Sequence, residues 1–228
     1  MDNPLLHLLQ LCDPALPIGG FSHSAGLETY VQKGIVHNKE TASHYLHEML
    51  TKNIFYNDGA FVSLAMNASA EKNAEKIFEI DELANATKIP EEIRMGSIKL
   101  SNRLLKIFQP VCNDELVTAY QSAVVRKSIQ GHYSVAFGVI ANALGINKQD
   151  ALVGFFYNLA AGIVTNSVKL IPLSQQAGQE ILFNVKKTIS NLANQINQID
   201  QDMIGLCSIG FDIASMEHEH LYSRLYMS

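Results

Sequence analysis

The sequence has no tryptophan and only three cysteines among its 228 residues. Cys12, Cys112 and Cys207 are odd in number and far apart, so they predict neither a disulfide framework nor a cysteine-based zinc site. This use of cysteine is typical of a reducing compartment, and we expect a cytoplasmic protein.

Positive charge is also scarce. The chain has 17 Lys and Arg against 22 Asp and Glu, which gives a formal net charge of −5 and a pI near 5.9. Binding to a nucleic-acid backbone needs clustered basic side chains, so the composition argues against a nucleic-acid partner.

The sequence lacks long uninterrupted apolar runs. The N-terminal stretch "MDNPLLHLLQLCDP" has an apolar core of roughly seven residues preceded by an acid, which indicates a helix and not a signal peptide. The nearly uncharged region 132–168 is divided by Lys148 and Asp150. We expect neither half to reach the roughly 18 to 20 apolar residues of a membrane span, and we interpret both as buried core helices.

What the chain does contain is a large apolar fraction, 47% of its residues, in a helical pattern with no convincing alternation of strands. The sequence therefore predicts an all-α, single-domain bundle of about nine or ten helices over residues 1–228. Proline, glycine and capping residues place these helices at about 4–12, 24–33, 39–55, 57–68, 69–87, 90–110, 113–129, 133–144, 148–170 and 174–197. Asn57 or Asp58 is expected to cap the fourth, Ser69 to begin the fifth, and Pro110 to end the sixth.

The loop "DPALPIGGFSHSAGLE", residues 13–28, gathers residue types that catalysts use. Its glycine spacing fits neither a phosphate-binding P-loop nor a dinucleotide loop, and Gly20 to Ser24 lacks the final glycine of a nucleophile elbow. A hydrolase that uses Ser22 and His23 remains a weaker alternative. We favour a turn between two helices in which Ser22 or Ser24 caps the second, and in which Phe21 and Ser22 shape the junction or an assembly surface.

Histidines offer the candidate metal ligands. His218 and His220, with Glu217 or Glu219, have the chemistry for nickel or zinc, but positions i and i+2 diverge on a helix, which favours a solvated turn. His44 and His47 share a helix face without a third ligand nearby. The residues predict no catalytic constellation.

A row of small and polar residues recurs every four positions in an apolar helix: Gly154, Asn158, Gly162 and Asn166. Such a row favours a close helix crossing within one subunit. A dimer seam or a polar-lined passage is the alternative.

The C-terminal segment, residues 211–228, places Leu221, Tyr222, Leu225 and Tyr226 at helical spacing among polar residues. This pattern suits docking on a partner, and equally a final helix that packs on its own domain.

Five blocks of the sequence resemble the UreF family of urease accessory proteins, in the family's order and over nearly the whole chain. They read "LLQLCDPALPIGGFSHSAGLE", "RMGSIKLSNRLLKIF", "GHYSVAFGVIANALGI", "NSVKLIPLSQQAGQ" and "DIASMEHEHLYSRLYMS". The chain departs from the family at Glu217 and Met227, where arginine is common, so its C-terminal segment lacks two positive charges.

The resemblance implies an all-α, non-enzymatic homodimer with no cofactor of its own. It would bind the UreD/UreH accessory protein and recruit the UreG GTPase, in a complex that loads nickel into apo-urease. The family's C-terminal segment is associated with UreD/UreH docking, which makes the partner-binding candidates Leu221, Tyr222, Arg224, Leu225 and Tyr226. The alternative is a metal carrier that binds nickel directly through its C-terminal histidines.

Overall fold

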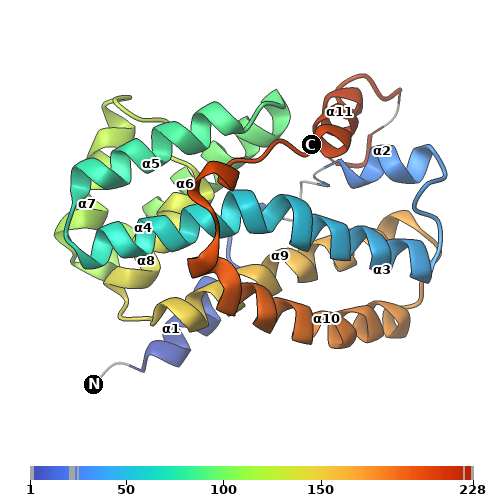
Figure 1. Cartoon of the computed structure of the whole chain (residues 1–228), viewed down its shortest axis with the longest axis horizontal. Coiled ribbons are helices and arrows are strands. Elements are labelled where there is room, and N and C mark those ends of the chain that lie inside the picture. Colours follow the sequence, from blue (N-terminus) through green and yellow to red (C-terminus); the bar gives the residue numbers. More distant parts are fainter. Residues whose placement is uncertain (1–2, 21–23, 25, 223, 227–228) are drawn as a thin grey trace.

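The computed structural model describes residues 3–20, 24, 26–222 and 224–226. Its elements run from Pro4 to His218 (Figure 1). They are α1 Pro4–Leu11, α2 Leu27–Gln32, α3 Lys39–Glu48, the π-helix η2 Met49–Gly59, α4 Ala60–Ala70, α5 Ala74–Thr87, α6 Glu91–Cys112, α7 Glu115–Val125, α8 Tyr133–Ala143, α9 Lys148–Leu170, α10 Gln175–Gln195, the short 3₁₀ turns η3 Ile196–Gln198 and η4 Gln201–Met203, and α11 Ile209–His218.

The predicted all-α class is confirmed, with no strand in the described residues. Since α3, η2 and α4 are continuous and count as one helix, the described residues form ten helices, apart from the 3₁₀ turns. Side-chain caps explain many of the starts: the Asn3, Asn38 and Asn147 side chains each accept a backbone N–H of the first turn that would otherwise lack a partner.

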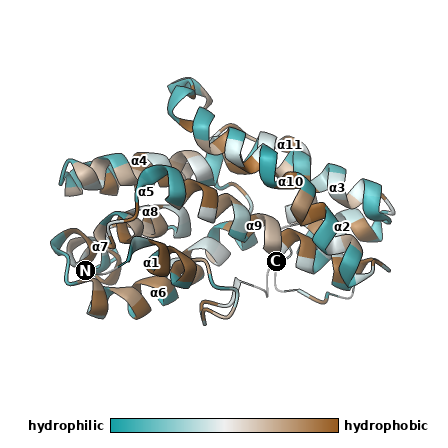
Figure 2. Cartoon of the chain, turned by 90° about the horizontal axis from the view of Figure 1, so that it is seen from below, coloured by the Kyte–Doolittle hydropathy of each residue, from teal (hydrophilic) through white to brown (hydrophobic). Residues whose placement is uncertain are grey.

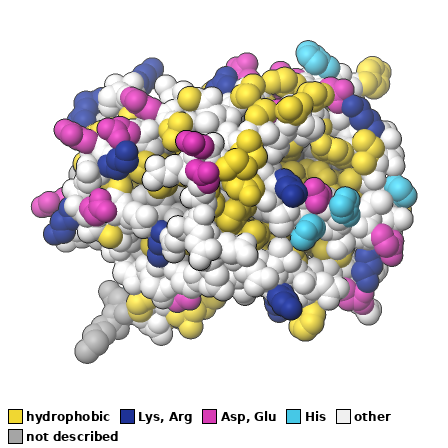
Figure 3. Space-filling view, viewed as in Figure 1, with side chains coloured by type: hydrophobic (Ala, Val, Ile, Leu, Met, Phe, Trp, Pro, Cys, Tyr) yellow, Lys and Arg dark blue, Asp and Glu magenta, His cyan; other side chains and the backbone are white. Residues whose placement is uncertain are grey.

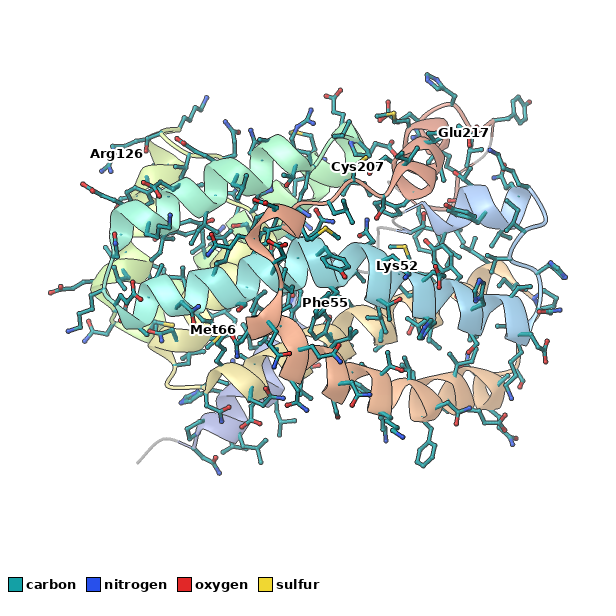
Figure 4. The ribbon with its side chains drawn as sticks, in the orientation of Figure 1. Lys52, Phe55, Met66, Arg126, Cys207 and Glu217 are labelled. Atoms are coloured by element: carbon teal, nitrogen blue, oxygen red, sulfur yellow. The ribbon has the colours of Figure 1, made fainter. Side chains whose placement is uncertain are left out.

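The continuous rod from Lys39 to Ala70 contradicts one prediction, that a new helix begins at Asn57 or Asp58. Figure 4 shows Lys52, Phe55 and Met66 along this single helix. Asn57 does not act as a cap. Its amide donates to the Asn53 carbonyl within the wider π-helical turns and to the Leu206 carbonyl, while the Asp58 carboxylate pairs with Lys88.

Three other predicted boundaries were wrong. Ser69 is buried in the last turn of α4, and α5 begins after the Asn73 cap. Pro110 lies inside α6, because a proline in the last turn removes only one hydrogen bond, and the helix ends at Asn113 in a left-handed conformation. Ser24 does not cap α2, whose N-cap is Gly26 without a side-chain bond.

The core is centred on α8, in which every residue from Tyr133 to Ala141 is buried. It contacts α4, α5, α6, α7 and α9. At the crossing with α4, a Cβ added at Gly138 would lie 2.8 Å from the Val62 carbonyl oxygen, so only glycine allows these two backbones to approach so closely. The surrounding helices show brown and teal stripes in Figure 2, as expected for helices with one buried face.

A buried carboxylate, Asp81 of α5, fixes the start of α8. Its two oxygens accept the backbone N–H groups of Gly131 and His132, at 2.8 and 2.7 Å, and the Tyr120 hydroxyl also donates to it. Asp81 is fully buried, so these donors replace the water that its charge has lost. Burial, followed by the charge of Asp81, raises the pKa of Tyr120 well above its usual value.

His132 itself is fully buried beside this carboxylate. Its ring nitrogens lie 3.2 Å from the Ser97 hydroxyl and 3.3 Å from the Asn85 side-chain oxygen. Burial dominates over the nearby charges and lowers the pKa of His132 to about 4, so the ring is neutral at physiological pH.

The helix α9 corrects the expectation that no helix in region 132–168 is long enough for a membrane span. By length and composition alone this 23-residue helix could cross a membrane. Half of its most apolar 18-residue stretch is buried, against α10 and other helices of the bundle. That packing is typical of the core helix of a folded bundle.

Candidate functional site

The C-terminal part of the chain returns across the rod before it reaches α2. Residues 199–208, which we call the connector, are fastened to the rod by the Gly205 N–H, 2.8 Å from the Tyr56 carbonyl oxygen. The following helix, α11, packs against α2 and α6. Thus α11 is a final helix packed on its own domain, and the residues after it, 219–222 and 224–226, form an irregular tail.

The outer face of α11 remains uncovered. Ile209, Ile213 and Met216 follow one another at helical spacing and are 68%, 50% and 40% exposed. Figure 3 shows hydrophobic side chains gathering over α11 and beside the connector. An apolar stripe of this kind is a common feature of protein interfaces.

A second buried carboxylate, Glu28 in the first turn of α2, holds the end of the tail. Its Oε1 accepts the Leu225 N–H at 2.8 Å, and its Oε2 accepts the Tyr226 N–H at 3.2 Å. Its Oε2 also lies 3.2 Å from Nε2 of His218, the last residue of α11. Only 4% of Glu28 is exposed, so these donors provide its solvation.

Glu92 of α6 completes the arrangement from the other side of His218. Its Oε2 lies 2.7 Å from His218 Nδ1, and its Oε1 accepts a hydrogen bond of 2.7 Å from Arg224 Nη1. Both nitrogens of the buried imidazole thus face carboxylate oxygens, one from α2 and one from α6. We call Glu28, Glu92, His218 and Arg224, with the amides of residues 225 and 226, the tail latch.

The five partner-binding candidates divide into two groups in this structure. Tyr222 and Leu225 are exposed and Leu221 is half-buried, so these side chains are open to a partner. Arg224 contacts Glu92, and Tyr226 is buried at 7% exposure, so these two hold the tail to its own domain. That any of the five touches a partner stays a prediction.

At Glu217, where the chain departs from the UreF pattern, the acid has a partner of opposite charge nearby. Glu217 projects from α11 beside α2, where its carboxylate forms an ion pair with Lys33 (Figure 4). An acid at this position therefore gains a contact between α11 and α2. Met227, the second departure, lies outside the described residues.

The loop that precedes α2 is organised by its apolar residues. Leu16 and Ile18 are both buried, and Arg103 of α6 donates to the Ile18 carbonyl at 2.9 Å. Gly19 has φ +82°, a conformation that favours glycine. The described part of the loop thus forms a packed turn, whereas Phe21, Ser22 and His23 lie outside the described residues.

A cavity of about 360 Å³ lies between this loop, η2, α6, α9 and the connector. Asn158, Gly162 and Asn166 line it from α9, and Asp58, Lys88 and Asp212 add charge to its wall. Gly154, the first residue of the small and polar row in α9, lies where α9 crosses α1 closely, since a Cβ at Gly154 would lie 2.7 Å from Leu8 Cδ1. The Asn158 amide also donates to the Cys12 carbonyl.

Candidate metal ligands are dispersed. Among the described residues, no group of three or more His, Cys, Asp or Glu is placed to hold a metal ion. His44, His47 and His220 are exposed, and the two carboxylates of the tail latch occupy both nitrogens of His218. Burial raises the pKa of the Cys12 thiol to about 12, which makes it a poor metal ligand.

Sequence reasoning missed Glu28, Glu92 and the role of His218. Glu28 stands in the quoted loop, and an acid in a first helical turn is ordinary. Its partners lie 190 to 198 residues further along the chain, so no local spacing reveals them.

The fold and the site define an all-α protein whose buried carboxylates hold chain segments in place and form no evident catalytic constellation in the described residues. The UreF family model matches residues 36–186. The chain is 47% identical over 221 residues to the urease accessory protein UreF of Haemophilus influenzae, covering 97% of this chain and 94% of the relative. It is 45% identical to that of Actinobacillus pleuropneumoniae, covering 97% of each, and 35% identical to that of Lachnoclostridium phytofermentans over the whole of both chains. The chain therefore belongs to the UreF family of urease accessory proteins.

Proposed function

We propose that this protein is a non-enzymatic assembly factor for urease: a cytoplasmic homodimer that binds UreD/UreH, recruits the UreG GTPase and thereby promotes nickel insertion into apo-urease. Family membership supports the role in urease maturation. The absence of an evident catalytic constellation in the described residues is consistent with a protein that acts through its surfaces.

The observation that carries this proposal is the two-sided C-terminal region. Its inner side is held by the tail latch, while its outer side presents the α11 stripe together with Tyr222 and Leu225. Exposed aromatic and aliphatic side chains next to a fixed backbone are suited to be the anchors of a protein interface.

A co-expression pull-down of the full chain with UreD/UreH and UreG tests the proposal. Tyr222→Ser with Leu225→Ser should weaken capture of UreD/UreH by about tenfold or more, as expected when interface anchors are removed. Phe183→Ser is the matched control, because Phe183 is 70% exposed, close to the 66% of Leu225, but lies on α10. Undiminished capture by the double variant would exclude the tail as the dock.

Nickel is the cargo of the assembled complex on this proposal, so we expect equilibrium dialysis to show weak or no stoichiometric binding of Ni²⁺ by the isolated chain. Stoichiometric binding that disappears with His218→Gln and His220→Gln would favour the metal-carrier alternative.

The cavity beside α9 supports a second role, in which Asn158 and Asn166 line part of a route for the metal. Asn158→Leu with Asn166→Leu should then reduce urease activation in a correctly assembled complex. Gly162→Ala is the control, since a Cβ there meets nothing within 4 Å. Full activation by the double variant would contradict this role.

A further inference from the structure

The tail latch separates the residues that hold the tail from those that it displays. Every carboxylate oxygen of Glu28 and Glu92 has a donor: a backbone amide, an imidazole nitrogen or a guanidinium nitrogen. Because Tyr222 and Leu225 contribute no side chain to these bonds, the latch can be complete while both side chains remain open to a partner.

Glu28 has the central place in this set. It is the member that accepts both amides at the end of the tail and also contacts His218, and it is much more buried than Glu92. If Glu28 loses its charge, two amides and one imidazole lose a charged acceptor together. If Glu92 loses its charge instead, the hydrogen bonds from the two amides to Glu28 remain.

The position of α11 depends less on Glu28. Ala214 and Ser215 are buried against the domain, and the Thr29 hydroxyl donates to the Ala214 carbonyl at 2.8 Å. The Lys33–Glu217 pair also joins α11 to α2, but both side chains are more than 40% exposed, so water screens it. A change at Glu28 should therefore release the tail and leave α11 in place.

We propose that Glu28 is a positioning residue that orders the tail on α2 and α6 before the partner arrives. This inference rests on the proposed function, because it takes the tail to be a docking surface for UreD/UreH. A segment that is already ordered binds more tightly than one that must be ordered during binding, since the entropy cost has been met within the free protein. Glu28 thus acts on partner affinity without touching the partner.

The first test measures tail release in the free, full-length protein. Trypsin cleaves after Arg224, and the rate of this cleavage reports how often the tail detaches, provided that detachment is fast relative to cleavage. Glu28→Gln, which keeps the size of the side chain, should raise the cleavage rate at Arg224 about tenfold while the helical circular dichroism stays unchanged. Glu92→Gln should give a smaller increase, and the matched control Glu217→Gln should stay within about twofold of wild type.

Equal cleavage of Glu28→Gln and wild type would overturn the inference. A second measurement covers the case in which Glu28→Gln fails to fold. In the full-length wild-type protein, hydrogen exchange should be slowed at the amides of residues 225 and 226. Exchange at the rate of an unstructured peptide would equally overturn it.

The second test measures affinity for UreD/UreH. Glu28→Gln should bind about tenfold more weakly, yet reach the same maximal capture at saturating partner, because its contact surface is intact. Unchanged affinity despite faster cleavage would overturn the link between tail order and docking. The proposed function fails by a different result, namely undiminished capture by Tyr222→Ser with Leu225→Ser, so the two failures are distinguishable.

Discussion

Asp81 and Glu28 have the same chemical role in two different parts of the molecule. Each is a buried carboxylate that accepts two successive backbone amides and lies beside a histidine. Asp81 joins α5 to the start of α8 in the middle of the core, whereas Glu28 joins α2 to the end of the tail. The surroundings differ, because α8 is buried on all sides and the tail lies at the surface. The same bonds therefore build a permanent joint in the core and a releasable one at the surface.

The largest effect is expected from breaking the core joint. Asp81→Ala leaves two amides and the Tyr120 hydroxyl without their buried acceptor, and we expect it to lower the free energy of unfolding by about 3 to 5 kcal/mol. Urea denaturation measures this value. Glu79→Ala on the same helix is the control, because its exposed pair with Lys76 contributes about 0.5 kcal/mol or less. A loss below about 1 kcal/mol for Asp81→Ala would contradict a structural role in the core.

The next effect concerns the crossing between α4 and α8, further along α8 from the Asp81 joint. In Gly138→Ala the new Cβ meets the Val62 carbonyl oxygen and the Ala65 methyl group within 3 Å, so α4 and α8 must separate. We expect a loss of about 1 to 3 kcal/mol by urea denaturation. Gly162→Ala, in a helix with open space at the new methyl group, should be neutral or stabilise by up to about 1 kcal/mol. Equal effects at both positions would contradict the tight crossing.

Acid should weaken the core joint through His132. In the unfolded chain this residue takes up a proton as the pH falls through its usual value of 6.5, whereas in the folded protein its pKa is about 4. Between these two pKa values the unfolded state binds more protons than the folded state. The contribution of His132 to stability therefore decreases as the pH is lowered, by up to about 1.4 kcal/mol per pH unit. Unfolding free energies measured from pH 7 to pH 4 should show a shallower slope for His132→Gln. Identical slopes would mean that the ring does not stay neutral.

The smallest effect should come from the surface joint. The Tyr226 hydroxyl is buried and, among the described residues, has no hydrogen-bond partner. Tyr226→Phe removes this unpaired group, so it should leave tryptic cleavage at Arg224 unchanged or slow it severalfold. Tyr222→Phe is the control, because its ring is exposed. Faster cleavage of Tyr226→Phe would show that the hydroxyl stabilises the latched tail.

The Asp81 and Glu28 sites also show how much of the structure can be predicted from the sequence. Caps at Asn3, Asn38 and Asn147 act locally, so the chain predicts most helices and the all-α class. It does not predict the π-helix, because Asn57 looks like a cap until the connector, about 150 residues later, gives it another partner. His218 reads as a solvated or metal-binding residue for the same reason. Its environment is created by Glu28 and Glu92, which only the tertiary structure brings to it.

The way Glu28 holds the tail has a consequence for how this protein can change over evolutionary time. The carboxylate binds main-chain amides, which every amino acid except proline supplies. Substitution at position 225, whose side chain is exposed, therefore leaves the anchor intact. Residues on the outer side of the tail are therefore free to diverge in step with a partner's surface, as long as Glu28 is retained to hold the path of the chain.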